Sequence, residues 1–278
     1  MGLPKNLITR ILTGIVFVSV ILGCILVNQY TYAGIFCIIQ ILALSEFYKL
    51  IGASYKIKIP VIANIIGGIL LFAGSFGYFS GLTGSPVIFL PYVCYLIFLF
   101  ISELFLRKKD PVVSLAFSVL GQIYLAVPFS LLNYIVFSYD GSYHHVYILA
   151  LLAMIWINDS FAYLSGVTLG RHKMFERISP KKSWEGFAGG AICTVASSFV
   201  FAHFFPGMPP AGWIGIALVV VIFGTFGDLI ESLIKRTLNI KDSGNILPGH
   251  GGVLDRFDSL ILAIPALTVY LAAVSYFR

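Results

Sequence analysis

The sequence contains few charged residues, because Asp, Glu, Lys and Arg together make up only 11% of its 278 residues. A soluble globular domain carries about a quarter, so this deficit excludes that class. Apolar residues make up 59% of the chain, and its mean hydropathy is +0.95. The composition therefore indicates a polytopic integral membrane protein.

Extensive polar surfaces and paired cysteines are also missing. The net charge of +6 does not indicate nucleic acid, since basic patches that bind nucleic acid lie on a large solvated surface. The cysteines all lie in apolar runs without a CxxC pair, which argues against a thiolate metal site or a disulfide framework. They are Cys24, Cys37, Cys94 and Cys193.

What the chain does have is apolar runs long enough to cross a bilayer, which takes roughly 20 residues. Such runs predict an all-α polytopic membrane protein with about nine transmembrane helices. Pro128 lies inside the fifth run and Pro265 inside the ninth, and each predicts a kink there. The nine runs are Leu7–Val27, Tyr30–Leu50, Pro60–Ser80, Val87–Leu106, Val112–Phe137, Val146–Leu169, Gly186–Phe205, Trp213–Leu233 and Phe257–Phe277.

Positive charge is confined to alternate ends of these runs. If the N-terminus is cytoplasmic, every Lys and Arg except Arg278 lies on the cytoplasmic side, as the positive-inside rule requires. The first run lacks a small-x-small cleavage site and is longer than a signal core, so we interpret it as a span. We expect a multi-pass protein of the inner (cytoplasmic) membrane with a cytoplasmic N-terminus.

The first five runs contain few charges. Glu46 and Glu103 are expected near helix ends, where a carboxylate extends toward water or pairs with a neighbouring cation, here Lys49 or Arg107. We therefore expect a structural role for both glutamates and no catalytic site in this half of the chain.

The second half differs, because Asn158 and Asp159 lie within the sixth run. An aspartate in a membrane span costs a few kcal/mol unless it is paired or metal-bound. Pairing with a cation of the next loop would make Asp159 a structural lock. Intramembrane ionisable residues are functional by default, and we take Asp159 as a candidate metal ligand.

Lys181, Lys182 and Ser183 precede a predicted helix start at Glu185 and Gly186. Adjacent lysines in a short loop are often only topology signals. However, the free N–H groups of a helix start, together with lysines, are able to bind an anion. We expect these three residues to bind a phosphorylated ligand.

The stretch from Asp228 to Asp258 concentrates the polarity of the C-terminal third. Asp228, Ser232 and Lys235 are spaced by four and three residues, so they share one face of a helix. A glycine-rich loop follows, where the backbone turns tightly and approaches a ligand. If a helix then restarts, Asp255 and Asp258 are neighbours again.

Carboxylates and cations occur together in this stretch. Hard carboxylate oxygens suit Mg²⁺, which usually takes one or two carboxylates and shares phosphate oxygens of a substrate. An ion pair that merely caps the last helix is the structural alternative for Asp255 and Arg256. The candidate metal ligands are Asp159, Asp228, Asp255 and Asp258, and the candidate phosphate-binding groups are Ser232, Lys235, Arg236, Lys241, His250, Gly251, Gly252 and Arg256.

The same residues resemble the signature of the phosphatidate cytidylyltransferases (CDP-diacylglycerol synthases). The resemblance covers Trp156–Asp258 in detail, whereas the first half agrees only in being a bundle of spans. It rests on Asn158–Asp159, Ala162–Tyr163, Gly166, Gly170 and Ser179–Glu185, then on Ser232, Lys235–Arg236, Lys241–Asp242, Gly244, Leu247–Pro248, His250–Gly252 and Asp255–Asp258.

This resemblance implies that CTP and phosphatidate react to CDP-diacylglycerol and pyrophosphate in phospholipid biosynthesis. It also implies Mg²⁺, with K⁺ as a second cation, a lipid bilayer around the chain and a homodimer. Residues 1–110 then form about four N-terminal transmembrane helices, and residues 111–278 form a catalytic transmembrane region with a cytoplasmic active site. In that site the catalytic residues are expected to be Asp228, Asp255, Asp258, Lys235 and Arg236.

Two alternative functions remain open at this point. One is a CTP-dependent lipid kinase of the polyprenol type, which uses the same nucleotide on another lipid. The other is an ion or solute transporter in which Asp159 and Asp228 line a pathway. A transporter predicts polar groups through the membrane depth, whereas these are expected at one face.

Overall fold

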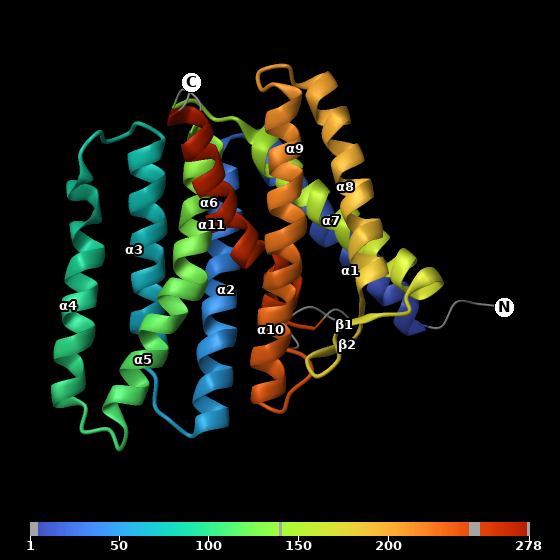
Figure 1. Ribbon diagram of the computed structural model, residues 1–278. Coiled ribbons are helices and arrows are strands. Elements are labelled where there is room, and N and C mark those ends of the chain that lie inside the picture. The colour runs from blue at the N-terminus through green and yellow to red at the C-terminus, as the bar shows by residue number, and fades with distance from the viewer. Residues whose placement is uncertain (1–4, 139–140, 245–250, 277–278) are drawn as a thin grey trace. The chain divides into compact units, whose positions relative to one another are not determined.

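The computed structural model describes residues 5–138, 141–244 and 251–276, and its colours follow the chain from blue to red (Figure 1). Most of the described residues are helical. The helices are α1 (Lys5–Val27), α2 (Gln29–Tyr55), α3 (Val61–Phe79), η1 (Pro86–Phe89), α4 (Leu90–Phe105), α5 (Pro111–Gly121), η2 (Gln122–Ala126), α6 (Val127–Phe137), α7 (His145–Leu169), α8 (Trp184–Phe204), α9 (Pro210–Val219), η3 (Val220–Gly224), α10 (Thr225–Thr237) and α11 (Leu254–Tyr276). Two short strands, β1 (Lys173–Phe175) and β2 (Ser179–Ser183), form an antiparallel hairpin between α7 and α8.

Each of the nine predicted runs coincides with one helix or with two or three helical elements that follow one another directly. Within the described residues, eight helical segments are long and apolar enough to cross a membrane. In α1, the apolar helix Leu12–Val27 is too short to be counted among them. The prediction of an all-α polytopic membrane protein is therefore confirmed, with the hairpin as an addition that the sequence did not reveal.

Two of the long segments contain a π-helical turn. The turn η2 links α5 to α6 and ends directly before Val127 and Pro128. Proline lacks an N–H, and its ring displaces the carbonyl four residues earlier, here that of Tyr124 inside η2. The structure therefore has a π turn directly before the place where the sequence predicts a kink, and the kink itself stays a prediction. A second π turn, η3, lies between α9 and α10 and ends four residues before Asp228.

The contacts divide the chain into two compact units. Unit 1 consists of Met1–Tyr143 and Ile240–Phe257, and unit 2 consists of His144–Asn239 and Asp258–Arg278. The division into residues 1–110 and 111–278 expected from the sequence is a functional one, and it stays a prediction.

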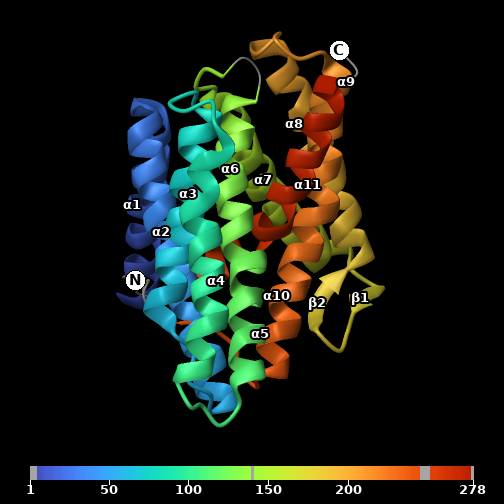
Figure 2. The ribbon, with the colours of Figure 1, turned by 90° about the vertical axis from the view of Figure 1, so that its left-hand side faces the viewer.

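In unit 1, α3 packs against α2, α4 and α6 (Figure 2). Buried side chains connect these helices across the apolar interior. Asn64 accepts a hydrogen bond from the Tyr95 hydroxyl at 2.8 Å and donates one to Ser118 Oγ at 3.0 Å. Polar groups in an apolar environment are costly unless they are paired, so this network holds α3, α4 and α5 in one arrangement.

In unit 2, α7 packs closely on α8 because glycines line their contact. A Cβ atom on Gly186 would lie 2.7 Å from the carbonyl oxygen of Ala162, and one on Gly190 would lie 2.7 Å from Asn158 Oδ1. These distances are too short for any side chain. The glycines therefore let the polar end of α7 approach the hairpin and the start of α8.

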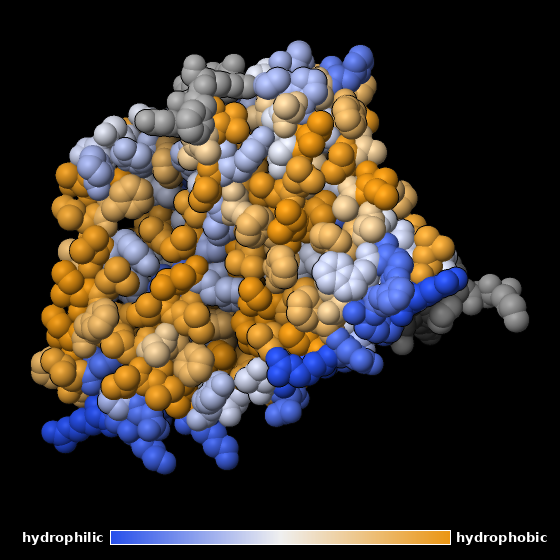
Figure 3. Space-filling view, in the orientation of Figure 1, coloured by the Kyte–Doolittle hydropathy of each residue, from blue (hydrophilic) through white to orange (hydrophobic). Residues whose placement is uncertain are grey.

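Hydrophobic residues cover most of the visible face, whereas hydrophilic residues gather around the hairpin and along the lower edge of the view (Figure 3). On α8, the large side chains of Ile192, Phe199 and Val200 are all more than half exposed. Apolar patches of this extent are rare on soluble monomers and mark surfaces that meet protein or lipid. The chain is therefore a multi-pass membrane protein.

Candidate active site

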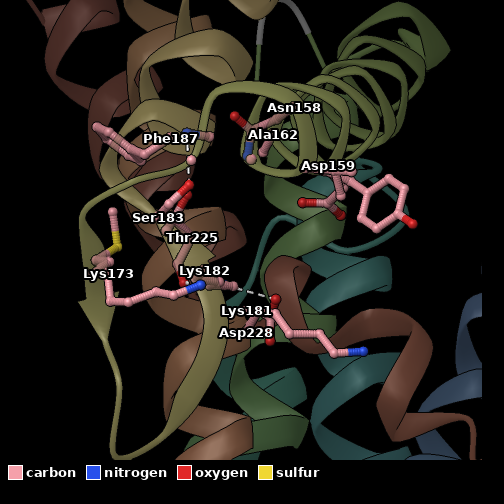
Figure 4. A pocket seen from close by; sticks show the side chains of 16 residues that line it. Asn158, Asp159, Ala162, Lys173, Lys181, Lys182, Ser183, Phe187, Thr225 and Asp228 are labelled. Carbon is pink, nitrogen blue, oxygen red and sulfur yellow. Dashed lines mark hydrogen bonds and ion pairs between the residues drawn. The ribbon is translucent and has the colours of Figure 1, made fainter.

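A cavity of about 690 Å³ lies in unit 2 between α7, the hairpin, the start of α8 and α10 (Figure 4). Its polar lining combines two carboxylates, Asp159 from α7 and Asp228 from α10, with three lysines. Its apolar lining comes from α7, α8 and the hairpin. The lining residues are Asn158, Asp159, Ala162, Tyr163, Gly166, Val167, Gly170, Lys173, Met174, Lys181, Lys182, Ser183, Gly186, Phe187, Thr225 and Asp228.

An ion pair spans this cavity from the hairpin to α10. Lys182 Nζ lies 2.7 Å from Asp228 Oδ2 and also donates to the carbonyl oxygen of Thr225 at 3.4 Å. The Lys182 and Asp228 side chains are 25% and 31% exposed, so they are partly desolvated and still accessible to a ligand. On the neighbouring turn of α10, the Ser232 hydroxyl donates to Asp228 Oδ1 at 3.2 Å. These contacts fix the orientation of the Asp228 carboxylate.

The hairpin is held in place at both of its ends. Ser183 is the N-cap of α8, and its Oγ accepts a hydrogen bond from the Gly186 N–H at 3.1 Å. Glu185 accepts from the N–H groups of Arg171 and His172, and its carboxylate lies 2.6 Å from His172 Nδ1. Because the helix start and the hairpin share these contacts, the three lysines keep a defined position beside the cavity.

The two carboxylates of the cavity fit a magnesium ion. Mg²⁺ usually binds one or two protein carboxylates and completes its shell with water and phosphate oxygens, and Asp159 and Asp228 supply that number. No group of three or more His, Cys, Asp or Glu side chains is arranged to hold a metal among the residues that the structure describes. This donor set suits an ion shared with a polyphosphate better than an ion held by protein alone.

The structure thus brings together five of the predicted residues, namely Asp159, Asp228, Lys181, Lys182 and Ser183, in one cavity. The Ser232 hydroxyl donates a hydrogen bond to the carboxylate of Asp228. Lys235 forms an ion pair with Glu231, one turn earlier in α10, at 2.5 Å. Arg236 donates a hydrogen bond at 3.4 Å to the carbonyl oxygen of Ile178, which lies between β1 and β2. Both cations therefore hold local structure in α10 and the hairpin, and their catalytic role stays a prediction.

The loop before α11 belongs to unit 1, and Asp255 organises it. The Asp255 carboxylate accepts hydrogen bonds from the backbone N–H of Ser243 at 2.9 Å and of Gly252 at 2.8 Å. Gly251 has a φ of +84°, a conformation that glycine adopts without strain. This carboxylate shapes the glycine loop, and its predicted role as a metal ligand is untested.

The remaining predicted residues lie in or beside this loop. Lys241 and Arg256 are exposed, and Gly252 is buried. Asp258 lies in α11 within unit 2, where its carboxylate accepts from the Ser259 N–H at 2.7 Å. A Cβ atom on Gly227 would lie 2.6 Å from the backbone oxygen of Asp258, so α10 and α11 approach closely beside Asp228. His250 lies outside the described residues.

The sequence did not reveal one lysine of the cavity, and it gave the wrong partners for two glutamates. Lys173 lines the cavity because β1 pairs with β2, which sets it opposite Ser183. Strands of three and five residues are too short to show a clear alternation in the sequence. Glu46 was expected to reach water or pair with Lys49, and this expectation is wrong. Its side chain is buried and accepts hydrogen bonds from the N–H groups of Val253 and Leu254. Glu103 pairs with Lys108 at 2.6 Å rather than with Arg107.

Comparison with known proteins agrees with this geometry. The sequence model of the cytidylyltransferase family matches residues 8–274. The chain belongs to this family. It is 32% identical over 271 residues to the phosphatidate cytidylyltransferase of Bacillus subtilis (strain 168), covering 96% of this chain and 98% of that protein.

Shorter matches are more similar. The phosphatidate cytidylyltransferase of Staphylococcus aureus (strain COL) is 44% identical over 127 residues, which is 45% of this chain and 48% of that protein. The enzyme of the same name from Staphylococcus saprophyticus is 42% identical over 130 residues, covering 46% of this chain and 50% of that protein.

Proposed function

We propose that this cytidylyltransferase transfers the cytidylyl group of CTP to phosphatidate and releases pyrophosphate, which gives CDP-diacylglycerol for phospholipid synthesis. The observation that carries the proposal is the cavity of unit 2, where two carboxylates and three lysines share one space. A polyphosphate and a metal ion together need such a mixed set. The names of the relatives supply the two substrates.

Lys173, Lys181 and Lys182 would bind the phosphate groups, because an ammonium group is a strong point charge for phosphate oxygens. Asp159 and Asp228 would hold Mg²⁺, which neutralises charge on the triphosphate when it is bound. K⁺ as a second cation remains part of the proposal. The apolar lining from Tyr163, Val167 and Phe187 would contact the glycerol and acyl part of the lipid.

The reaction is an in-line displacement. A phosphate oxygen of phosphatidate forms a bond to the α-phosphorus of CTP, and the bond from that phosphorus to the bridging oxygen of the β-phosphate breaks. The phosphomonoester is largely dianionic at neutral pH, since its second pKa is about 6, so no side chain has to remove a proton. The residues of this chain contribute by positioning and by fixed positive charge.

The arrangement in the membrane is part of the same proposal. The alternation of Lys and Arg along the chain favours a cytoplasmic N-terminus in the cell membrane. CTP would then reach the cavity from the cytoplasm, and the lipid would reach it from the surrounding bilayer. A homodimer is expected by analogy with the family.

Turnover by the purified protein in detergent tests this function. With CTP, phosphatidate and Mg²⁺, a lipid product with the mass of CDP-diacylglycerol should accumulate, and pyrophosphate should appear in equal amount. Both should vanish when phosphatidate is replaced by diacylglycerol. CTP-dependent phosphorylation of diacylglycerol or a polyprenol, without pyrophosphate, would instead identify a lipid kinase. Absence of CTP consumption with every lipid would overturn the proposal.

A further inference from the structure

Glu46 is a buried carboxylate within an apolar helix, and its hydrogen-bond partners lie far away in the sequence, at Ser243, Val253 and Leu254. It belongs to α2 and is only 5% exposed. Its Oε1 accepts a hydrogen bond from the N–H of Val253 at 3.0 Å, and its Oε2 accepts one from the N–H of Leu254 at 2.9 Å. The Ser243 hydroxyl donates to Oε2 at 3.4 Å. All of these residues belong to unit 1.

These contacts lie at the start of α11. The first N–H groups of a helix have no acceptor within the helix, and α11 begins at Leu254. A carboxylate at this end accepts charge-assisted hydrogen bonds and interacts favourably with the helix dipole. Glu46 therefore caps a helix to which it is not adjacent in sequence.

The loop is shaped around this carboxylate. A Cβ atom on Gly244 would lie 2.5 Å from Glu46 Oε1, and one on Gly252 would lie 2.6 Å from Oε2 and collide with Ser243 Oγ. Side chains at either position would displace the carboxylate or the loop. Gly244 and Gly252 both belong to the motif that resembles the family signature, and their close contact with Glu46 explains why a side chain does not fit at either position.

The energetics couple α2 to the loop. An unpaired carboxylate in an apolar interior is strongly unfavourable, and here the backbone N–H groups of Val253 and Leu254 compensate by donating hydrogen bonds to Glu46. Compensation lasts only while the loop keeps this conformation. Within unit 1, two carboxylates therefore accept hydrogen bonds from this loop. Asp255 belongs to the start of α11, and Glu46 belongs to α2.

We propose that Glu46 is a positioning residue of the cytidylyltransferase reaction: it fixes residues 243–244 and 251–255, including Asp255, in the conformation needed for turnover. Glu46 acts through the loop and touches no substrate. The link to turnover rests on the proposed function, whereas the anchoring of the loop does not.

The test compares Glu46→Gln with Glu103→Gln. Gln keeps the size of Glu but offers one acceptor oxygen, and its NH₂ group faces a backbone N–H. Glu103 is also a buried carboxylate of unit 1, paired with Lys108 at 2.6 Å, so its variant controls for general destabilisation. Hydrogen–deuterium exchange over residues 240–257 and kcat/KM for CTP are measured for each variant and for the unchanged protein.

We expect Glu46→Gln to raise exchange in this segment at least about tenfold and to lower kcat/KM by about 10- to 100-fold, as for other residues that orient a site indirectly. Glu103→Gln should change neither quantity. If Glu46→Gln does not fold, Gly244→Ala is used instead, because its Cβ atom would disturb the same contact from the loop. In the unchanged protein, the N–H groups of Val253 and Leu254 should be protected from exchange.

Two results would overturn the proposal in different ways. Unchanged exchange in folded Glu46→Gln, or rapid exchange at Val253 and Leu254 in the unchanged protein, would show that the carboxylate does not anchor the loop. Raised exchange with unchanged kcat/KM would show that the anchored loop does not serve turnover. If the unchanged protein has no cytidylyltransferase activity, the proposed function fails, and the exchange result still decides the anchoring.

Discussion

The ammonium group of Lys182 lies 2.7 Å from Asp228 Oδ2, and both side chains line the cavity of unit 2. Partly exposed ion pairs contribute only about 0–1 kcal/mol to stability, so this pair has little structural value. We predict that Lys182→Met lowers kcat/KM by about 10²- to 10³-fold, the usual loss when a group that stabilises developing charge is removed. Its melting temperature in detergent should be nearly unchanged.

Lys108→Met is the matched control for Lys182→Met. Lys108 pairs with Glu103 in unit 1, where both side chains are less than a tenth exposed. Breaking a buried pair on one side costs about 3–5 kcal/mol, so this variant should melt at a clearly lower temperature while its folded fraction retains normal kcat/KM. A loss of stability with full activity in Lys182→Met would contradict the assignment of Lys182 to the site.

The carboxylates of the cavity predict a dependence on Mg²⁺. Chelation of divalent cations should abolish turnover, and added Mg²⁺ should restore it. Asp159→Asn and Asp228→Asn each remove one hard anionic ligand and should raise the Mg²⁺ concentration needed for half-maximal rate. Asp110→Asn, at an exposed position before α5, should leave that concentration unchanged. Equal Mg²⁺ requirements in all three variants would refute the metal role of Asp159 and Asp228.

Asp255 has a different environment from these two carboxylates. Its oxygens accept hydrogen bonds from the N–H groups of Ser243 and Gly252, and Asn supplies only one acceptor oxygen. We predict that Asp255→Asn remains folded in the membrane and loses turnover. Turnover would be lost either because Asp255 is a metal ligand or because it holds the loop in place. A titration with Mg²⁺ separates these two causes, because excess Mg²⁺ restores turnover after the loss of a ligand but not after displacement of the loop. Near-normal turnover in Asp255→Asn would show that turnover requires neither metal binding by Asp255 nor its hydrogen bonds to the loop.

The contact between α7 and α8 predicts a steric effect at Gly186. A Cβ atom there would lie 2.7 Å from the backbone oxygen of Ala162 and 3.1 Å from Ser183 Oγ, and backbone is unable to move away locally. Gly186→Val should therefore cost about 1–3 kcal/mol of stability and should lower activity by widening the cavity. Gly34→Ala in α2 meets nothing within 4 Å and should be tolerated. A normal melting temperature for Gly186→Val would contradict the close packing.

Much of the fold follows from local sequence. The apolar runs determine the helices because a span has to satisfy its own backbone hydrogen bonds, and Pro128 marks the π turn directly before it. The spacing of Asp228 and Ser232 places them on one helix face, and the structure joins them by a hydrogen bond at 3.2 Å. Such relations depend on a few neighbouring residues, so the sequence reveals them.

Relations between distant segments could not be predicted in this way. In the sequence, Glu46 looks like a glutamate near a helix end. Nothing in the residues around it indicates that its carboxylate accepts hydrogen bonds from the N–H groups of Val253 and Leu254. Lys173 reaches the cavity only because two very short strands pair. Both cases depend on tertiary contacts that a single sequence does not encode in any periodic pattern.

The measurement that tests the central claim most directly uses CTP labelled at either the α- or the γ-phosphate. With phosphatidate and Mg²⁺, the α-label should appear in the lipid and the γ-label in pyrophosphate, because the bond between the α- and β-phosphates is the one that breaks. The Lys182→Met variant should reduce both transfers together. Appearance of the γ-label in the lipid, with the α-label left in soluble CDP, would contradict cytidylyl transfer.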